Sequence, residues 1–202
     1  MSLARPFVLA SVLLTLGCAA TQEPSVARLD RAVRSTAAVL PGVPEGLPRR
    51  SGAGDLADGD LPAGATVYDD HPGIARLDPR LLEELRAATA DAAAEGVGIV
   101  VNSGWRSQAY QQRLFDEAVA EHGSESAAAE WVARPGTSVH EAGAAVDVGP
   151  LDATLWLADH GADYGLCRVY DNEPWHFELV ADAVDDGCPA TYADPADDPR
   201  LQ

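Results

Sequence analysis

The sequence predicts an α+β domain with a small central sheet, and its patterns of apolar residues carry that prediction. Some segments repeat apolar residues at helical spacing, and short apolar or alternating runs typical of strands lie between them. The chain has 202 residues, of which 47% are hydrophobic. This size and composition suit one folded domain with additional segments outside it.

The first predicted helix has clear signals at both ends. Asp78 is a good N-cap, Pro79 occupies the first helical position, and Gly96 ends the helix. The apolar run 97–101 follows directly and predicts a strand. A helix followed by a short strand is the first repeat of the alternating pattern.

The later elements continue this alternation. Ser107 and Ser124 are N-cap residues for two further helices, expected over 107–121 and 124–133. The remaining expected elements are a strand over 144–148, a helix over 152–160 and a strand over 175–180.

The charge of the chain narrows the choice of partners. The sequence contains 32 Asp and Glu against 14 Lys and Arg, a formal net charge of -18. Nucleic acid and anionic lipid surfaces are therefore poor candidates for a charge-driven partner. A monomer is expected.

The N-terminus has the features of an export signal over residues 1–18. Its apolar run, 7–16, is too short to span a bilayer. Gly17 before Cys18 resembles a bacterial lipobox, which favours lipidation of Cys18. The alternative is an ordinary secretory signal cut near residues 19–20. Lipidation would be the only link between this chain and a membrane.

The segments on either side of the expected domain differ from it in composition. Residues 19–64 are rich in Pro and Gly, which predicts a flexible tether. The folded domain is placed at 65–193, and residues 194–202, which contain Asp and Pro, are expected to form a loose acidic tail. Within the domain, Cys167 and Cys188 form an even pair, which favours a disulfide over two buried thiols in an exported chain.

The stretch SVHEAGAAVD contains a pair, His140 and Glu141, that looks like the start of a helical H-E-x-x-H zinc motif, but position 144 is Ala. Asp147 is another candidate ligand, although seven residues of one helix rise roughly 10 Å. Zinc requires each donor atom at about 2 Å. Gly143 permits a turn, after which a strand can bring Asp147 back toward His140. Glu141 is then expected to be a solvent-facing loop acid.

A third ligand comes from the stretch EPWHFE. Strand alternation directs Trp175 and Phe177 to the core, and His176 and Glu178 to the opposite face. His176 can complete a three-ligand zinc site with a position left for water. Glu173 precedes Pro174 at the mouth of the strand, where its carboxylate can accept a proton from a metal-activated water.

Arg106 lies between the strand 97–101 and the following helix. Its planar guanidinium can bind a carboxylate or a polarised carbonyl of a substrate. The alternative is an ordinary ion pair with one of the many acidic residues. Gln111, one turn into the helix, could add a hydrogen bond.

Together these motifs resemble the VanY-type D-alanyl-D-alanine carboxypeptidases, members of the LAS group of zinc peptidases. The motifs are S-x-H-x-x-G-x-A-x-D, the E-x-x-H of EPWH, and SGWRS-x-x-x-Q. The resemblance implies a hedgehog/D-Ala-D-Ala-peptidase-like fold, with a small antiparallel central sheet flanked by helices. It also implies Zn²⁺ as cofactor, bound by His140, Asp147 and His176, with Glu173 as catalytic base.

The resemblance further implies that Arg106 contacts the substrate, and that Ser138 and Gln111 help to hold its terminal residue. The expected activity is hydrolysis of the terminal peptide bond of peptidoglycan stem peptides by a metal-activated water, outside the cytoplasm. The enzyme would be anchored by lipid to the outer face of the cell membrane or secreted. Alternatives are a cell-wall endopeptidase, an L,D-carboxypeptidase, and a non-catalytic zinc-stabilised binding module.

Overall fold

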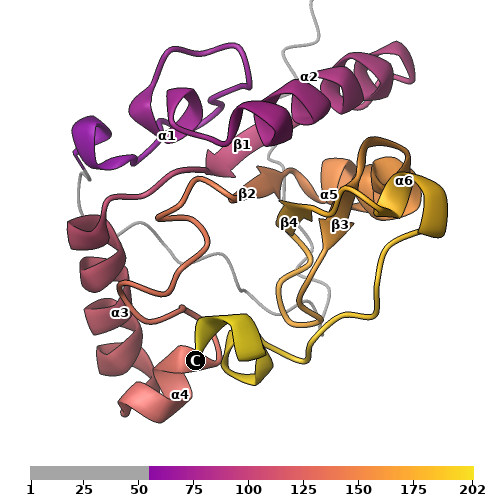
Figure 1. Cartoon of the computed structure of the whole chain (residues 1–202). Helices are drawn as coiled ribbons and strands as arrows, with labels where there is room; N and C mark the ends of the chain where they lie inside the picture. The colour runs from indigo at the N-terminus through magenta and orange to yellow at the C-terminus, as the bar shows by residue number, and fades with distance from the viewer. Residues whose placement is uncertain (1–54) are drawn as a thin grey trace, which may run out of the picture. The chain divides into compact units, whose positions relative to one another are not determined.

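A computed structural model describes residues 55–202. The expected export signal, Cys18 and most of the expected tether lie outside these residues. The described chain contains a four-stranded sheet of order β1-β2-β4-β3, in which every neighbouring pair is antiparallel (Figure 1). The strands are β1 (Val100–Ser103), β2 (Ala145–Gly149), β3 (Leu166–Arg168) and β4 (His176–Leu179). The predicted α+β class with a small antiparallel sheet is confirmed.

Helices flank this sheet. They are α1 (Pro72–Ala75), α2 (Pro79–Ala94), α3 (Gln108–His122), α4 (Glu125–Ala129), α5 (Leu151–His160) and α6 (Ala183–Asp186). Short 3₁₀ turns are η1 (Leu56–Asp58), η2 (Gly161–Tyr164), η3 (Pro195–Asp197) and η4 (Pro199–Leu201).

The predicted helix caps are present. The Asp78 carboxylate accepts the backbone N–H groups of Arg80 and Leu81 at 2.9 and 3.2 Å, which satisfies two donors at the start of α2. The Ser107 hydroxyl accepts the N–H of Tyr110 at 3.0 Å and caps α3. These local bonds explain why the starts of both helices could be predicted from sequence.

The main core lies between the sheet and the two helices α2 and α5. It contains apolar residues of α2 (Leu81, Leu85, Ala88, Ala92), of α5 (Ala153, Trp156, Leu157) and of the strands (Val101, Val146, Val148, Leu166, Phe177). A smaller cluster joins α3 to α4 through Phe115, Ala118 and Ala128. Because the large core fixes one face of the sheet, the polar residues of β2 and β4 are directed to the other face.

Two predicted element boundaries differ from the structure. The strand expected at 97–101 is β1 at Val100–Ser103. Its partner β2 ends at Gly149, which pairs with Val100, and the next residue, Pro150, has no N–H to continue the ladder. The helix expected at 124–133 ends as α4 at Ala129. Trp175, expected in the core, is only partly buried because it precedes β4.

The predicted domain boundaries are too narrow at both ends. Leu61, expected in the tether, is 1% exposed and belongs to the main core. Asp58 accepts a hydrogen bond from the Ser107 hydroxyl at 2.9 Å. Residues 194–202, expected to be loose, form η3 and η4, and Asp198 within them is 0% exposed. Pro, Gly and Asp indicate irregular backbone, but irregular backbone can still be packed.

The Cys167–Cys188 disulfide is present and joins residues 21 positions apart. Cys167 lies in β3, so the bond ties the chain after α6 to the edge of the sheet.

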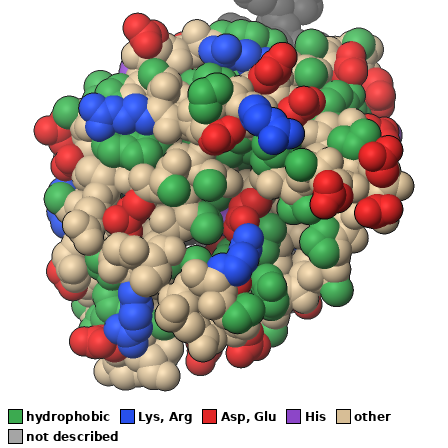
Figure 2. All heavy atoms as spheres, in the orientation of Figure 1, with side chains coloured by type: hydrophobic (Ala, Val, Ile, Leu, Met, Phe, Trp, Pro, Cys, Tyr) green, Lys and Arg blue, Asp and Glu red, His purple; other side chains and the backbone are tan. Residues whose placement is uncertain are grey.

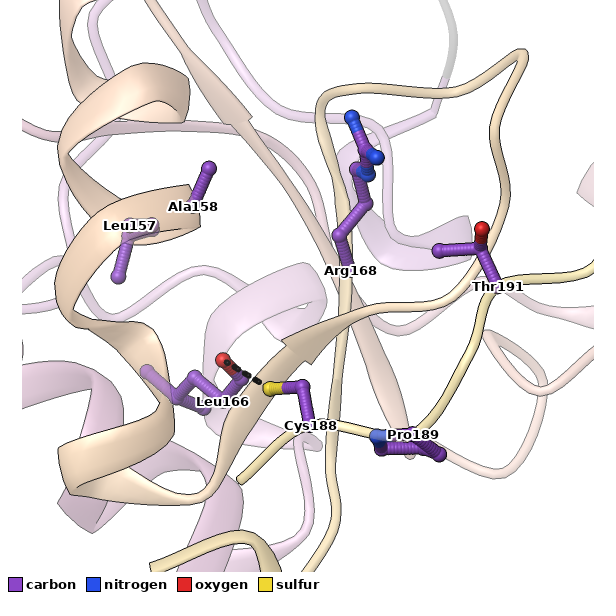
Figure 3. Close-up of a pocket in the computed structure, with 7 residues that line it drawn as sticks. All are labelled: Leu157, Ala158, Leu166, Arg168, Cys188, Pro189 and Thr191. Atoms are coloured by element: carbon purple, nitrogen blue, oxygen red, sulfur yellow. Dashed lines mark hydrogen bonds between the residues drawn. The ribbon is translucent and has the colours of Figure 1, made fainter.

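Beside this disulfide lies a pocket of about 230 Å³ whose lining includes Leu157, Arg168 and Pro189 (Figure 3). None of the predicted metal-binding, catalytic or substrate-binding residues lines this pocket. Among residues 55–202, no helix is long and apolar enough to cross a membrane.

Replacing Cys167 and Cys188 together by Ala should lower the free energy of unfolding by about 3 kcal/mol, because the loop they close regains its freedom in the unfolded chain. Chemical denaturation of the oxidised wild type and of the double variant measures the difference. Adding a reductant should destabilise the wild type alone. Equal stability of oxidised and reduced wild type would contradict the prediction.

Candidate metal and catalytic site

Strand register brings two of the predicted ligands together. Asp147 of β2 pairs with His176 of β4 on one side and with Ser103 of β1 on the other. Residues directly opposite each other in an antiparallel pair place their Cβ atoms about 4.5–5.5 Å apart on the same face. Asp147 Oδ1 lies 3.2 Å from His176 Nδ1. The sheet alone therefore joins an aspartate and a histidine that are 29 residues apart.

The third predicted ligand, His140, comes from the loop before β2. Its Nδ1 donates a hydrogen bond to the carbonyl of Gly104 at 2.8 Å. Gly143 closes the loop at φ +70°, and a Cβ there would lie 2.3 Å from the carbonyl oxygen of Arg76. Only glycine fits this turn without displacing the backbone. The loop therefore depends on Gly143 to present His140 to the strand residues.

Three acceptor atoms meet at the centre of the site. His140 Nε2 lies 3.2 Å from His176 Nδ1 and 3.4 Å from Asp147 Oδ1. His176 directs its other nitrogen, Nε2, to Glu178 Oε1 at 3.2 Å. When both rings are neutral and each proton is on the nitrogen that faces away, two lone pairs and a carboxylate oxygen converge. This state of the cluster is suited to a cation between its members.

The geometry fits a zinc ion. Two imidazole nitrogens and one carboxylate oxygen are ligands that zinc takes, and three protein ligands leave a fourth position open. A tetrahedral ion about 2.1 Å from His140 Nε2 and from His176 Nδ1 would hold these two nitrogens about 3.4 Å apart. Their distance in the structure, 3.2 Å, is close to that value. The three residues are buried, and their donor atoms all lie within 4.8 Å of one another.

The electrostatics also favour a cation. Burial by itself would lower the pKa of His176, but hydrogen bonds with Asp147 and Glu178 raise it to about 10. Burial would raise the pKa of Asp147, but the charge and hydrogen bond of His140 hold it well below its ordinary value. Burial and the charge of Arg106 lower the pKa of His140. A metal ion binding here would displace a proton.

Glu173, the predicted base, lies at the edge of this cluster. Its Oε2 is 3.6 Å from His176 Nδ1, and the residue is 8% exposed. Burial raises the pKa of its carboxyl to about 7, although the charge of His176 opposes the shift. A carboxyl with a pKa near 7 can both accept and release a proton at neutral pH.

Arg106 is bonded to Asp147, one of the three candidate metal ligands. Its Nη2 donates to Asp147 Oδ2 at 2.6 Å, on the oxygen that the histidines do not face. Nε donates to the Ser103 hydroxyl at 2.8 Å, and Nη1 donates to Gln111 Oε1 at 3.2 Å. Arg106 thus forms the ion pair that was the alternative prediction, and its partner, Asp147, is a predicted metal ligand. One bond from each nitrogen fixes the plane of the guanidinium.

The two other predicted substrate contacts are both buried. Gln111 is 0% exposed; it accepts from Arg106 and donates its amide N–H to the carbonyl of Ala133 at 2.8 Å. It therefore bonds to Arg106, and its contribution to holding the terminal residue of a substrate stays a prediction. Ser138 is 5% exposed and lies two residues before His140.

Two acidic residues close to the candidate metal ligands, Glu178 and Glu141, form hydrogen bonds with neighbouring residues. Glu178, predicted on the same strand face as His176, bonds to it at 3.2 Å and to Arg200 at 2.7 Å. Arg200 was not among the predicted site residues, because the composition of residues 194–202 indicated a loose segment. Glu141, expected to be a solvent-facing acid, accepts the N–H of Gly136 at 2.7 Å. Its carbonyl accepts from the Trp105 indole, so it supports the loop.

The surface over the sheet face combines both signs of charge. Figure 2 shows acidic side chains at the edge of a hollow near the middle of the visible face, next to a basic side chain.

Comparison with known proteins gives consistent matches. The model of the VanY family, described as D-alanyl-D-alanine carboxypeptidase, matches residues 74–182. A D-alanyl-D-alanine carboxypeptidase of Enterococcus faecalis is 35% identical over 130 residues, covering 52% of this chain and 48% of that protein. The putative carboxypeptidase YodJ of Bacillus subtilis is 31% identical over 109 residues, covering 43% of this chain and 40% of that protein. The chain thus matches less than half the length of either relative.

Among solved structures, VanYB in complex with D-alanine-D-alanine superimposes with a TM-score of 0.51 at 31% identity, covering 55% of this chain and 74% of that one. The LdcB LD-carboxypeptidase has a TM-score of 0.51 at 24% identity, covering 65% and 71%, and supports the fold alone. The family match covers more than half of the 202 residues and includes all three metal-binding candidates. This chain therefore belongs to the VanY family of D-alanyl-D-alanine carboxypeptidases.

Proposed function

We propose that this chain is a zinc-dependent carboxypeptidase that removes the terminal D-Ala from peptidoglycan stem peptides. The observation that carries the proposal is the convergence of His140, Asp147 and His176 beside a buried glutamate, Glu173. Family membership supports the reaction class, and the related VanYB, which binds D-alanine-D-alanine, supports the substrate class.

Zinc held by His140, Asp147 and His176 would supply a Lewis acid for the scissile carbonyl and a water that is nucleophilic at neutral pH. Glu173 accepts the proton of the attacking water and later delivers it to the amine that leaves. Its burial suits both steps, because a carboxyl with a pKa of about 7 exchanges its proton readily near neutrality.

Arg106 is proposed to bind the substrate while it holds Asp147. A guanidinium has five N–H donors, so bonds to Ser103, Gln111 and Asp147 leave capacity for a carboxylate or a carbonyl oxygen. Gln111 contributes by fixing Arg106. Ser138 is proposed to contact the terminal residue of the substrate.

We further propose that the chain is exported by a signal within residues 1–18, and that Cys18 remains as the first residue of the mature protein and bears a lipid. The Cys167–Cys188 disulfide supports export, because such bonds persist mainly in oxidising compartments.

The function is tested by incubating purified protein with a muropeptide ending in D-Ala-D-Ala, with and without a chelator, and analysing the products by mass. Loss of one Ala that the chelator abolishes is expected. A cut within the peptide would instead indicate an endopeptidase. Cleavage only of peptides ending in a single D-Ala would indicate an L,D-carboxypeptidase. No metal-dependent change would indicate a binding module.

Zinc content tests the ligand set. The wild type should retain one zinc ion per chain after dialysis, and His176→Ala should retain far less, because one of three ligands is lost. Elemental analysis gives the stoichiometry. His160→Ala is a suitable control, since His160 stacks on Trp156 in α5. Equal zinc content in wild type and His176→Ala would refute the assignment.

Glu173→Ala should keep its zinc but lose roughly 10²–10⁴-fold in kcat, the usual contribution of general acid–base catalysis. Zinc content and muropeptide turnover are measured on the same sample. Glu83→Ala, which removes an exposed acid of α2 instead, should retain the turnover of the wild type. Undiminished turnover of Glu173→Ala would remove Glu173 from the mechanism.

A further inference from the structure

A line of ionic contacts runs from His176 away from the metal site. His176 Nε2 lies 3.2 Å from Glu178 Oε1, and Arg200 bonds to both oxygens of Glu178, at 2.7 Å through Nη1 and 3.2 Å through Nη2. Glu178 is 5% exposed. The guanidinium therefore neutralises a buried carboxylate whose other partner is a proposed metal ligand.

Arg200 is itself held on its other side. Its Nε lies 3.0 Å from each oxygen of Asp198, and Asp198 is 0% exposed. The hydroxyl of Tyr170 donates to Asp198 at 2.9 Å, and the ring of Tyr170 lies 5.0 Å from that of His176. Arg200 thus links two buried carboxylates on the side of His176 away from the metal.

The segment that carries Arg200 is attached at several points. The disulfide fixes Cys188 to β3, and Tyr192 N donates to the carbonyl of Val169 at 2.9 Å. Residues 194–202 then turn back beside α4 (Figure 1). Cys188, Tyr192 and residues 194–202 lie beyond 74–182, the part that matches the family model. The arginine that bonds to Glu178 therefore comes from outside the matched segment.

The effect of Glu178 and Arg200 on the His176 ring follows from the chemistry of histidine ligands. A ring that binds a metal through Nδ1 must carry its proton on Nε2, and a carboxylate that accepts this proton fixes both tautomer and ring orientation. Glu178 can do this only if its own orientation is fixed and its buried charge is balanced. Arg200 provides both, because it binds the two carboxylate oxygens together.

We propose that Arg200 is a positioning residue of the metal site, which acts through Glu178 to orient His176 for zinc. The proposal rests on the proposed zinc function, but zinc affinity can be measured without any substrate. Through Arg200, residues 194–202 would have a role in holding the metal, although their composition predicted a loose segment.

The test compares Arg200→Met with Arg134→Met. Both arginine side chains are about equally exposed, at 45% and 46%, and both form a 2.7 Å ion pair with a glutamate. Zinc affinity is measured by competition with a chromophoric chelator. Arg200→Met should bind zinc roughly 10-fold more weakly, a typical effect of losing a partner behind a metal ligand. Arg134→Met should match the wild type, and Arg200→Lys should recover part of the affinity.

A double-mutant cycle separates this role from general destabilisation. Glu178→Gln should weaken zinc binding, and adding Arg200→Met to it should cost little more, because the arginine acts through that carboxylate. The visible spectrum of the Co²⁺ form should shift in both single variants. Thermal unfolding of the metal-free proteins verifies that each variant is folded.

Three outcomes would overturn the inference. They are unchanged zinc affinity in folded Arg200→Met, equal losses in Arg200→Met and Arg134→Met, and full additivity of the Arg200 and Glu178 substitutions. The proposed function fails in a different way. A wild type that binds zinc but cleaves no muropeptide would refute the activity, while a zinc defect in Arg200→Met would still support the positioning role.

Discussion

The pairing of Asp147 with His176 across β2 and β4 is the constraint on which the site depends. In this register both side chains lie on one face of the sheet, and Phe177 and Val146, the neighbours of these two residues, lie on the other. A slip of one residue would exchange the two sets. The apolar core between the sheet, α2 and α5 fixes the register, because a slip would place a charged cluster within it.

Each proposed metal ligand is held by a charged or polar hydrogen-bond partner. Arg106 binds the outer oxygen of Asp147, and the Gly104 carbonyl accepts from His140. Glu178 bonds to His176, and Arg200 balances Glu178. Buried charges are stable only when they are paired and hydrogen-bonded. Asp147, His176 and Glu178 each have a partner that also fixes the direction of the side chain.

Much of the fold and site could be predicted because the signals were local. Asp78 and Ser107 identify helix starts through bonds to residues two or three positions away. Glycine at 143 and alternation around His176 are also local patterns. The 97–101 strand was misplaced because β1 begins where its partner β2 permits pairing, which depends on residues almost 50 positions later. The short strand β3 has too few residues to show a pattern.

The extent of the domain was misjudged for a related reason. Composition describes the backbone that a segment can adopt, so the Pro- and Gly-rich residues near Leu61 and the Asp-rich residues near Asp198 both indicated loose chain. Neither pattern contains information on what the segment packs against. Leu61 packs against the core, and Asp198 meets Tyr170 and Arg200, all through contacts that local sequence does not encode.

The sequence by itself determined the chemical types present: two histidines, an aspartate and a glutamate at spacings that a turn and two strands can bring together, and two cysteines able to pair. The tertiary structure decided which atoms meet. It showed that Arg106 bonds to Asp147, that Gln111 bonds to Arg106, and that Arg200 supports Glu178. These contacts join residues from separate elements, and their geometry follows from core packing and strand register, which act over the whole domain.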